Sequence, residues 1–271
     1  MKVRFFTDGY TEMPGWLVLR GLGRKRIRLP SLVACLEHPR LGTIVFDTGY
    51  GGRFHQVTKK LPNALYRWIT PVVQTEVSLA EQLLRSGIDP AEVRHVFVSH
   101  YHADHTGGLR DFPKATFYSS SEAWASVKGK RGLAAVRHGF LPQLLPDDFE
   151  QRLVISTPEC WHEHSALAGL GLGWDVFGDG SALAVRLPGH AIGQTGLLIT
   201  RDDGKEILLA ADACWLSDGY RENRLPHPIT RMIQYWPDLK ATLQRLHNFH
   251  HQRPEVWIIP THCPEILAEL H

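Results

Sequence analysis

The stretch FVSHYHADHTGG, residues 97–108, constrains the fold of this chain more than any other, because it crowds His100, His102, Asp104 and His105 into six positions directly behind an apolar run. The run 96–98 reads as a buried strand, and the polar residues follow it at a turn. Burying ionisable side chains is costly unless they are paired or hold a metal ion. Histidine is the commonest side-chain metal ligand, and the chain has 16 of them. The stretch therefore predicts a metal site at the end of a strand.

Three later apolar runs also end in ligand-type residues. The segments SALAVRLPGH, EILLAAD and VWIIPTH end at His190, Asp212 and His262. Each run has the length and composition of a buried strand. These three residues are the candidates for completing the site from distant parts of the chain.

The spacing within the first cluster allows two neighbouring metal ions. His100 and His102 alternate by two and project to the same side, whereas Asp104 and His105 belong to the next turn. Zinc favours imidazole nitrogen and carboxylate oxygen, and a catalytic zinc keeps one position open for water. One short segment can thus supply ligands to two metal ions that lie side by side.

The order of the expected elements indicates stacked sheets with helices outside them. A strand at 43–49 precedes a helix that starts at a capping box, Ser78 and Glu81, and stops at Gly87. A strand over 93–100 follows. Later come strands at 181–190, 195–200 and 206–212, a helix over 238–252 and a last strand at 256–262. Segment 121–180 shows no clear period. We expect two mixed sheets flanked by helices.

Charge and composition exclude several classes of protein. Thirty basic and 28 acidic residues leave a formal charge of only +2, which argues against a nucleic-acid partner. No run of eighteen apolar residues occurs, so no membrane span or membrane partner is expected. Four scattered cysteines without a C-x-x-C pair indicate free thiols and a cytoplasmic protein.

Charge counting favours hydrolysis at the predicted site. Two divalent cations bring four positive charges, of which Asp104, Asp212 and a bridging hydroxide remove three. The site stays electropositive, which suits an oxyanion that forms on an attacked carbonyl or phosphoryl group. Such paired ions supply hydroxide near neutral pH. Asp104 is expected to pass a proton to the leaving alkoxide. Asp104 and Asp212 are both predicted to be catalytic residues.

The motifs HYHADH at 100–105, PGH at 188–190, AD at 211–212 and PTH at 260–262 resemble the metallo-β-lactamase superfamily in kind and in order. Within it, the segment 177–196 and the 22 positions from His190 to Asp212 look most like the acyl-homoserine lactonase group. The resemblance implies an α+β fold, an αββα sandwich of two mixed sheets flanked by helices. It implies a single domain over 1–271, with an insert at about 121–180 that contributes to a pocket or to a homodimer contact.

The resemblance also implies roles for the site residues. One ion would be held by His100, His102 and His190, the other by Asp104, His105 and His262, with Asp212 as a bridge. Asp47, in the motif FDTG, would orient a ligand. The ions would be divalent, zinc first, with manganese, cobalt or iron as alternatives.

One position departs from the pattern. The lactonases carry a tyrosine three positions after the bridging aspartate, where this chain has Trp215, which can line a pocket but cannot act as a phenolic acid. The leading hypothesis is a dinuclear metal-dependent hydrolase in which a metal-bridging hydroxide attacks a small-molecule ester or lactone, with an acyl homoserine lactone as the candidate substrate. The alternatives are an enzyme like the mononuclear iron persulfide dioxygenases, a phosphodiesterase or nuclease of the same superfamily, and a non-catalytic binding module.

Overall fold

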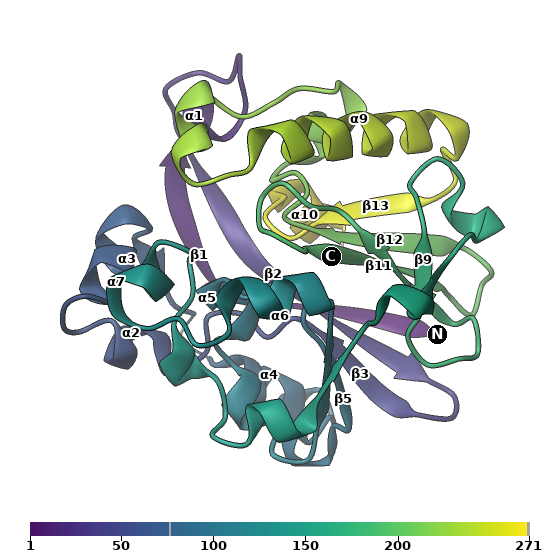
Figure 1. Cartoon of the computed structure of the whole chain (residues 1–271), viewed down its shortest axis with the longest axis horizontal. Coiled ribbons are helices and arrows are strands. Elements are labelled where there is room, and N and C mark those ends of the chain that lie inside the picture. The colour runs from purple at the N-terminus through teal and green to yellow at the C-terminus, as the bar shows by residue number, and fades with distance from the viewer. Residues whose placement is uncertain (76, 270–271) are drawn as a thin grey trace.

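Two β-sheets stack face to face, and helices cover both outer sides (Figure 1). The computed structural model describes residues 1–75 and 77–269. Within these residues a seven-stranded sheet has the order β4-β1-β2-β3-β5-β6-β7, and a six-stranded sheet has the order β13-β12-β11-β10-β9-β8. Both sheets contain parallel and antiparallel pairs, so the predicted αββα sandwich of mixed sheets is confirmed. The single-domain prediction over 1–271 also includes residues 76, 270 and 271, which lie outside the described residues.

The elements have the following bounds. The strands are β1 (Lys2–Pro14), β2 (Arg26–His38), β3 (Gly42–Phe46), β4 (Val72–Val73), β5 (His95–Phe97), β6 (Thr116–Ser119), β7 (Leu153–Ile155), β8 (Trp161–His162), β9 (Gly173–Asp175), β10 (Ala182–Arg186), β11 (Thr195–Thr200), β12 (Glu206–Ala211) and β13 (Trp257–Pro260). The α-helices are α1 (Gly15–Val18), α2 (Phe54–Val57), α3 (Ala64–Ile69), α4 (Leu79–Arg85), α5 (Ala103–Thr106), α6 (Ser121–Val127), α7 (Gly132–Val136), α8 (Ser217–Arg221), α9 (Trp236–Gln252) and α10 (Pro264–Glu269). Short 3₁₀ helices cover Pro90–Glu92, Leu109–Asp111, Pro142–Leu144, Phe149–Arg152, Pro158–Cys160, Ser165–Leu167 and Pro228–Met232.

Strand β2 shows how side-chain alternation builds the layers. Leu32, Ala34 and Leu36 point into the space between the two sheets, where they meet residues of the second sheet. Val33 and Cys35 point the other way, into the layer under α4 and α6. Successive strand residues face opposite sides of a sheet, so a strand buried on both faces must be apolar throughout. Residues 29–36 of β2 are all buried, and all of them except Ser31 are apolar.

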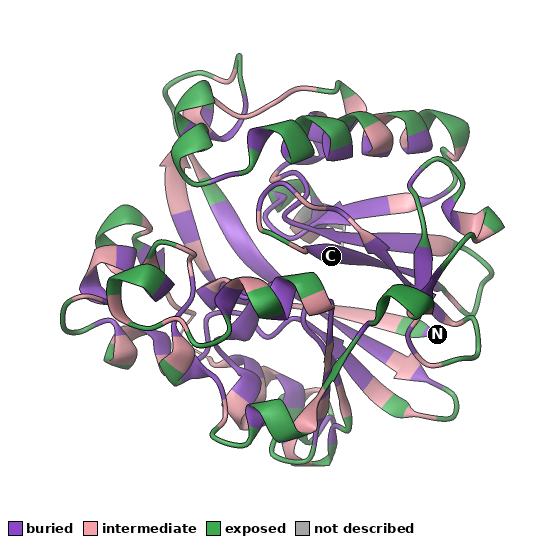
Figure 2. Cartoon of the chain, in the orientation of Figure 1, coloured by how far each residue is buried: buried purple, intermediate pink, exposed green. Residues whose placement is uncertain are grey.

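Helix α9 covers the outer face of the second sheet. Its residues Leu243, Leu246 and Phe249 pack against β10, β11, β12 and β13, and the opposite side of the helix is exposed (Figure 2). The three-to-four-residue spacing of these apolar residues gives the helix one buried stripe. The predicted helix is confirmed, and it begins two residues earlier than Asp238, at Trp236.

Other local predictions are confirmed with shifted ends. Ser78 caps α4 by accepting a hydrogen bond from the Glu81 amide at 3.3 Å. Strand β5 stops at Phe97 rather than at His100, because the chain turns there toward the candidate metal ligands. The long N-terminal hairpin of β1 and β2 was not predicted, since β1 is half-buried along much of its length and shows no clean alternation.

Segment 121–180 contributes to both sheets. It supplies β7 to the edge of the first sheet and both β8 and β9 to the second.

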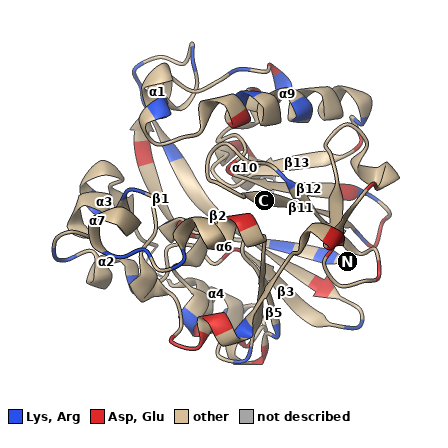
Figure 3. Cartoon of the chain, in the orientation of Figure 1, with Lys and Arg blue, Asp and Glu red and all other residues tan. Residues whose placement is uncertain are grey.

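Acidic and basic residues are interspersed over the elements in view (Figure 3). Across the described residues, no helix combines the length and apolarity that crossing a membrane requires. All four cysteines are free.

We expect Phe97→Ala to lower the free energy of unfolding by about 3–5 kcal/mol. The Phe97 side chain is fully buried between the sheets, stacked on Phe46 with ring centroids 5.7 Å apart. The matched control is Leu84→Ala on α4, where the leucine is 57% exposed and the loss should be under about 0.5 kcal/mol. Urea unfolding measures both, and equal losses would contradict this packing.

Candidate metal centre

Sheet direction brings the predicted ligand residues to one edge of the sandwich. Strands β3 and β5 are parallel neighbours, followed by Asp47 and by the turn that carries His100. Strands β12 and β13 are also parallel, followed by Asp212 and the turn that carries His262. Strand β10 leads to His190 and runs in the direction of β12, because both are antiparallel to β11. The carboxyl ends of all five strands therefore deliver their side chains to one place.

The remaining ligand residues lie on the short helix α5. His102 is its N-cap residue, and Asp104 and His105 lie within it. The Thr48 amide and hydroxyl both donate to the His105 carbonyl, at 3.0 Å and 2.9 Å. The Ser31 hydroxyl donates to the Asp104 carbonyl at 2.9 Å. The backbone of α5 is thus held by Ser31 of β2 and by Thr48 in the turn after β3.

Two of the turns contain backbone that L-residues rarely adopt. Asp47 has a φ of 57° and Ala211, directly before Asp212, has a φ of 48°. The left-handed conformation costs an alanine about 1–2 kcal/mol. The turn at Ala211 is held by a hydrogen bond of 3.0 Å from the Thr261 amide to the Ala211 carbonyl, which joins it to the turn of His262. Strain of this kind concentrates at functional sites.

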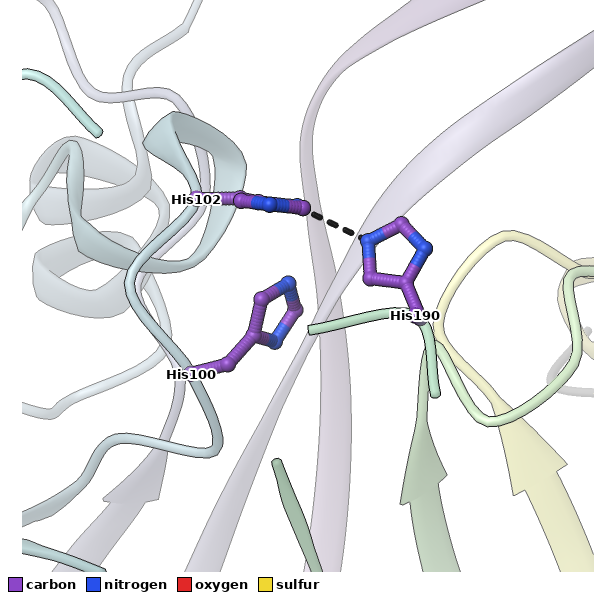
Figure 4. A group of neighbouring side chains, drawn as sticks. All are labelled: His100, His102 and His190. Atoms are coloured by element: carbon purple, nitrogen blue, oxygen red, sulfur yellow. Dashed lines mark hydrogen bonds between the residues drawn. The ribbon is translucent and has the colours of Figure 1, made fainter. Parts of the chain in front are cut away.

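His100, His102 and His190 form the first group of potential ligands, and their rings converge (Figure 4). The ring centroid of His100 lies 4.5 Å from that of His102 and 5.1 Å from that of His190. The Nδ1 atom of His102 lies 2.8 Å from the Nε2 atom of His190. The three ligand atoms of this group lie within 4.8 Å of one another, as a single ion requires.

Asp104, His105, Asp212 and His262 form the second group. The Nε2 atom of His262 lies 2.9 Å from Asp212 Oδ2 and 3.2 Å from Asp104 Oδ2. Asp212 Oδ2 also lies 3.2 Å from His190 Nε2 in the first group. The carboxylate of Asp212 therefore lies between the two groups.

The imidazoles of the first group are held in their neutral form. Burial, with the neighbouring imidazoles of His105 and His102, lowers the pKa of His100 well below its usual range. Burial and the nearby His190 lower the pKa of His102 to about 3. Burial also lowers the pKa of His190. A neutral imidazole has the lone pair that a metal ion needs.

In the second group, the pKa values of the histidines are raised instead of lowered. Burial disfavours the charged form of His262, but Asp212 and Asp104 outweigh it and raise its pKa to about 10. The pKa of His105 is likewise raised, against burial, by the carboxylates of Asp104 and Asp47. The same contacts, again against burial, hold the pKa values of Asp104 and Asp212 well below their usual range. Both aspartates are therefore ionised at neutral pH.

Several buried ligand-type atoms lack a hydrogen-bond partner in the described part of the chain. Among the candidate ligands they are His100 Nε2 in the first group and His105 Nε2 and Asp212 Oδ1 in the second, the latter two 3.3 Å apart without hydrogen-bond geometry. Buried polar atoms are normally paired, because an unpaired one costs about 1–3 kcal/mol. The donor set of five imidazoles and two carboxylates is the one that zinc prefers. These residues fit divalent metal ions.

Hydrogen-bond acceptors lie next to the Nδ1 atoms of His105 and His262, on the side of each ring away from the candidate metal centre. Asp47 Oδ2 accepts from His105 Nδ1 at 2.7 Å, and its carboxylate also accepts from the amide and hydroxyl of Ser99. The carbonyl of Pro30 accepts from His262 Nδ1 at 2.7 Å. Such contacts fix the ring and leave Nε2 free for a metal ion. Asp47 thus lies next to His105, a candidate ligand.

Trp215 lies beside the first group. Its ring is half-buried, and the centroid lies 6.0 Å from that of His190 in an edge-to-face arrangement. The indole also packs with Val18, Leu19 and Leu29. The predicted pocket residue is therefore near the candidate ligands and forms part of an apolar wall.

Sequence analysis missed several residues that support the site. Ser99 directly precedes His100, so its place could have been inferred, whereas the Pro30 carbonyl carries no side-chain signal. Gly139 lies against His102, and a Cβ atom there would stand 2.2 Å from His102 Cδ2. Its φ of 63° also favours glycine. Nothing in the unpatterned segment 121–180 marked this contact.

The sequence model of the metallo-beta-lactamase superfamily matches residues 30–246. The N-acyl homoserine lactonase AttM of Rhizobium radiobacter is 26% identical over 209 residues, which are 73% of this chain and 68% of that protein. An N-acyl homoserine lactone hydrolase, solved with the product N-hexanoyl-L-homoserine at its catalytic metal centre, superposes with a TM-score of 0.73 at 18% identity, covering 100% of this chain and 96% of the other. AidC, a dizinc quorum-quenching lactonase, gives a TM-score of 0.64 at 15% identity, with 97% and 87% covered.

We expect Gly139→Ala to displace His102 and to weaken zinc binding by about 10–100-fold. The new methyl group would overlap the His102 ring, and relief requires the ring or the backbone to move. Chelator competition measures the affinity. The matched control is Gly129→Ala, since Gly129 has a similar φ of 74° but open space around its Cβ position. Equal zinc affinities in the two variants would contradict the contact.

We expect zinc binding at pH 7 to release about two protons. The raised pKa values of His105 and His262 mean that both rings carry their protons at pH 7 in the metal-free protein, and His262 loses its proton only as the pH rises through about 10. A bound ion needs the lone pair, so it displaces each proton. Affinity should then rise up to about tenfold per pH unit for each proton released.

Calorimetry in two buffers of different ionisation enthalpy counts the protons released on zinc binding. The apparent enthalpy should differ between the buffers at pH 7. An enthalpy that is independent of the buffer would contradict the protonated state of His105 and His262.

Proposed function

This chain belongs to the metallo-beta-lactamase superfamily and is a metal-dependent hydrolase, and from that premise we propose that it opens the ring of a lactone, with an N-acyl homoserine lactone as substrate. The relative AttM described above is named for that activity, and the two solved structures described with it are named as a homoserine lactone hydrolase and a lactonase. Hydrolysis of another small ester is the wider form of the proposal.

The observation that carries the proposal is the presence of two complete ligand groups at one sheet edge. We assign one ion to His100, His102 and His190 and the other to Asp104, His105 and His262, with Asp212 as the bridge. Zinc is the first choice, because imidazole and carboxylate are its usual ligands, and manganese, cobalt and iron are alternatives. A complete second group favours this assignment over a mononuclear iron enzyme.

When bound, two divalent ions polarise the attacked carbonyl and make hydroxide available near neutral pH. The chain's own residues supply position and proton transfer. Asp104 Oδ2 faces His262 and His105, which leaves the other carboxylate oxygen to take the proton that the attacking water gives up and to pass it to the leaving alkoxide. Asp47, behind His105, orients that ring through its hydrogen bond.

We further propose that Trp215 forms one wall of the substrate site. Its edge-to-face contact with His190 places an apolar surface beside the candidate metal centre. An indole cannot donate the proton that a tyrosine phenol could, so protonation of the leaving group falls to Asp104. Segment 121–180, whose Gly139 contacts His102, would add to the pocket or to a homodimer contact. We also propose that residues 1–271 form one domain and that the protein works in the cytoplasm, as its free thiols suggest.

We expect zinc-loaded protein to hydrolyse short- and long-chain N-acyl homoserine lactones and to release one proton per ring opened. Asp212→Ala should lower kcat/KM by about 100-fold or more, because the ions lose the carboxylate between them. A pH indicator follows turnover. Asp203→Ala, on the exposed turn between β11 and β12, is the matched control and should be unaffected.

Absence of lactone turnover by protein that has bound two ions would contradict the substrate, and other esters, thioesters and phosphodiesters would then be assayed. Equal activity of Asp212→Ala and wild type would contradict the site itself.

A further inference from the structure

Three of the four histidines that present Nε2 to the site have a hydrogen-bond acceptor beside Nδ1. His105 and His262 point Nδ1 at the Asp47 carboxylate and the Pro30 carbonyl. His100 Nδ1 lies 3.1 Å from the Ser99 hydroxyl, which can accept as well as donate. A neutral imidazole carries one proton, so an acceptor behind Nδ1 leaves the lone pair on Nε2.

His190 also presents Nε2 to the site, and the residue behind its Nδ1 is Gln234. The Gln234 amide nitrogen lies 3.3 Å from His190 Nδ1. With the amide in that orientation it donates, and the His190 proton must then be on Nε2, where it would block metal binding. Only an amide oxygen in this place leaves the Nε2 lone pair free.

An unpaired atom indicates which orientation is stable. The Gln234 side chain is buried, and its Oε1 atom has no hydrogen-bond partner. The two ends of an amide are nearly equal in size, so the group can turn over in place. When the Gln234 amide is turned over, its Oε1 atom accepts a hydrogen bond from the Nδ1–H group of His190. The adjoining cavity, of about 20 Å³ and lined in part by Gln234, Asp212 and Trp215, has room for about one water molecule that could pair with the amide nitrogen.

The backbone around Gln234 is fixed to the turn that carries His190. The Tyr235 amide donates to the Gly189 carbonyl at 2.7 Å, and the Thr242 hydroxyl donates to the Pro188 carbonyl at 2.7 Å. Gly189 has a φ of 131°, and a Cβ atom there would lie 2.3 Å from the Leu239 backbone. The start of α9 and the His190 turn are therefore in close contact, and Gln234 has little freedom to move away.

We propose that Gln234 is a positioning residue, which accepts a hydrogen bond from His190 Nδ1 and so holds Nε2 of that ring ready for a metal ion. The proposal rests on the metal site proposed above. Gln234 touches no reacting atom in this scheme and acts only through His190. It extends the site to the segment before α9, 44 positions after His190.

Two substitutions distinguish a hydrogen-bond acceptor at position 234 from a residue that only fills space. Gln234→Glu keeps the shape of the side chain, and its carboxylate only accepts hydrogen bonds. Gln234→Met keeps the approximate size but neither donates nor accepts a hydrogen bond in this way. We expect Gln234→Met to lower the affinity for the ion held by the first group by about 10–100-fold, and Gln234→Glu to keep or raise it. Gln244→Met, on the exposed side of α9, is the matched control and should bind like wild type.

Chelator competition with zinc and the visible spectrum of the cobalt-loaded protein report binding, and thermal unfolding of metal-free protein reports folding. The ¹⁵N shifts of labelled histidine in zinc-loaded wild type should show a protonated Nδ1 on His190. Equal loss in Gln234→Glu and Gln234→Met, or no loss in Gln234→Met, would overturn the role of Gln234. Failure of wild type to bind two ions would instead overturn the metal site.

Discussion

The packing of the two sheets through their inner faces is the constraint on which the rest of the structure depends. Phe46 and Phe97 of the first sheet stack with nearly parallel rings, and Phe97 also meets Trp174 of the second. At the site edge the sheets are joined directly, by hydrogen bonds from Leu32 to the Thr261 carbonyl and from Thr195 to the Ser99 carbonyl. Turns distant in the chain are thus held in contact by apolar burial between the sheets.

The site that results is costly to bury, and this cost explains its electrostatics. Carboxylates and imidazoles removed from water must be paired or hold a metal ion. Asp104 and Asp212 are paired with His105 and His262, while the first group of histidines stays neutral. Metal ions held by these residues would replace the shared protons, which would couple metal binding to protonation and to folding.

The acceptors behind the histidines extend this coupling through the fold. Pro30 belongs to β2, Asp47 follows β3, and Gln234 precedes α9, so each ring is oriented by a different element. Precise orientation of ligands depends on such partners. In the proposed substrate site, the indole of Trp215 and segment 121–180 would determine the selectivity of this hydrolase.

The sequence by itself determined the sandwich class and the candidate ligands, because apolar strand runs and ligand-type residues such as His100 and Asp212 are local patterns. It also indicated Asp47 through its place after a strand. Only the tertiary structure decided that Gly139 packs on His102 and that Gln234 and the Pro30 carbonyl stand behind His190 and His262. These contacts join residues between 37 and 232 positions apart and depend on backbone shape and packing, which leave no periodic signal in the sequence.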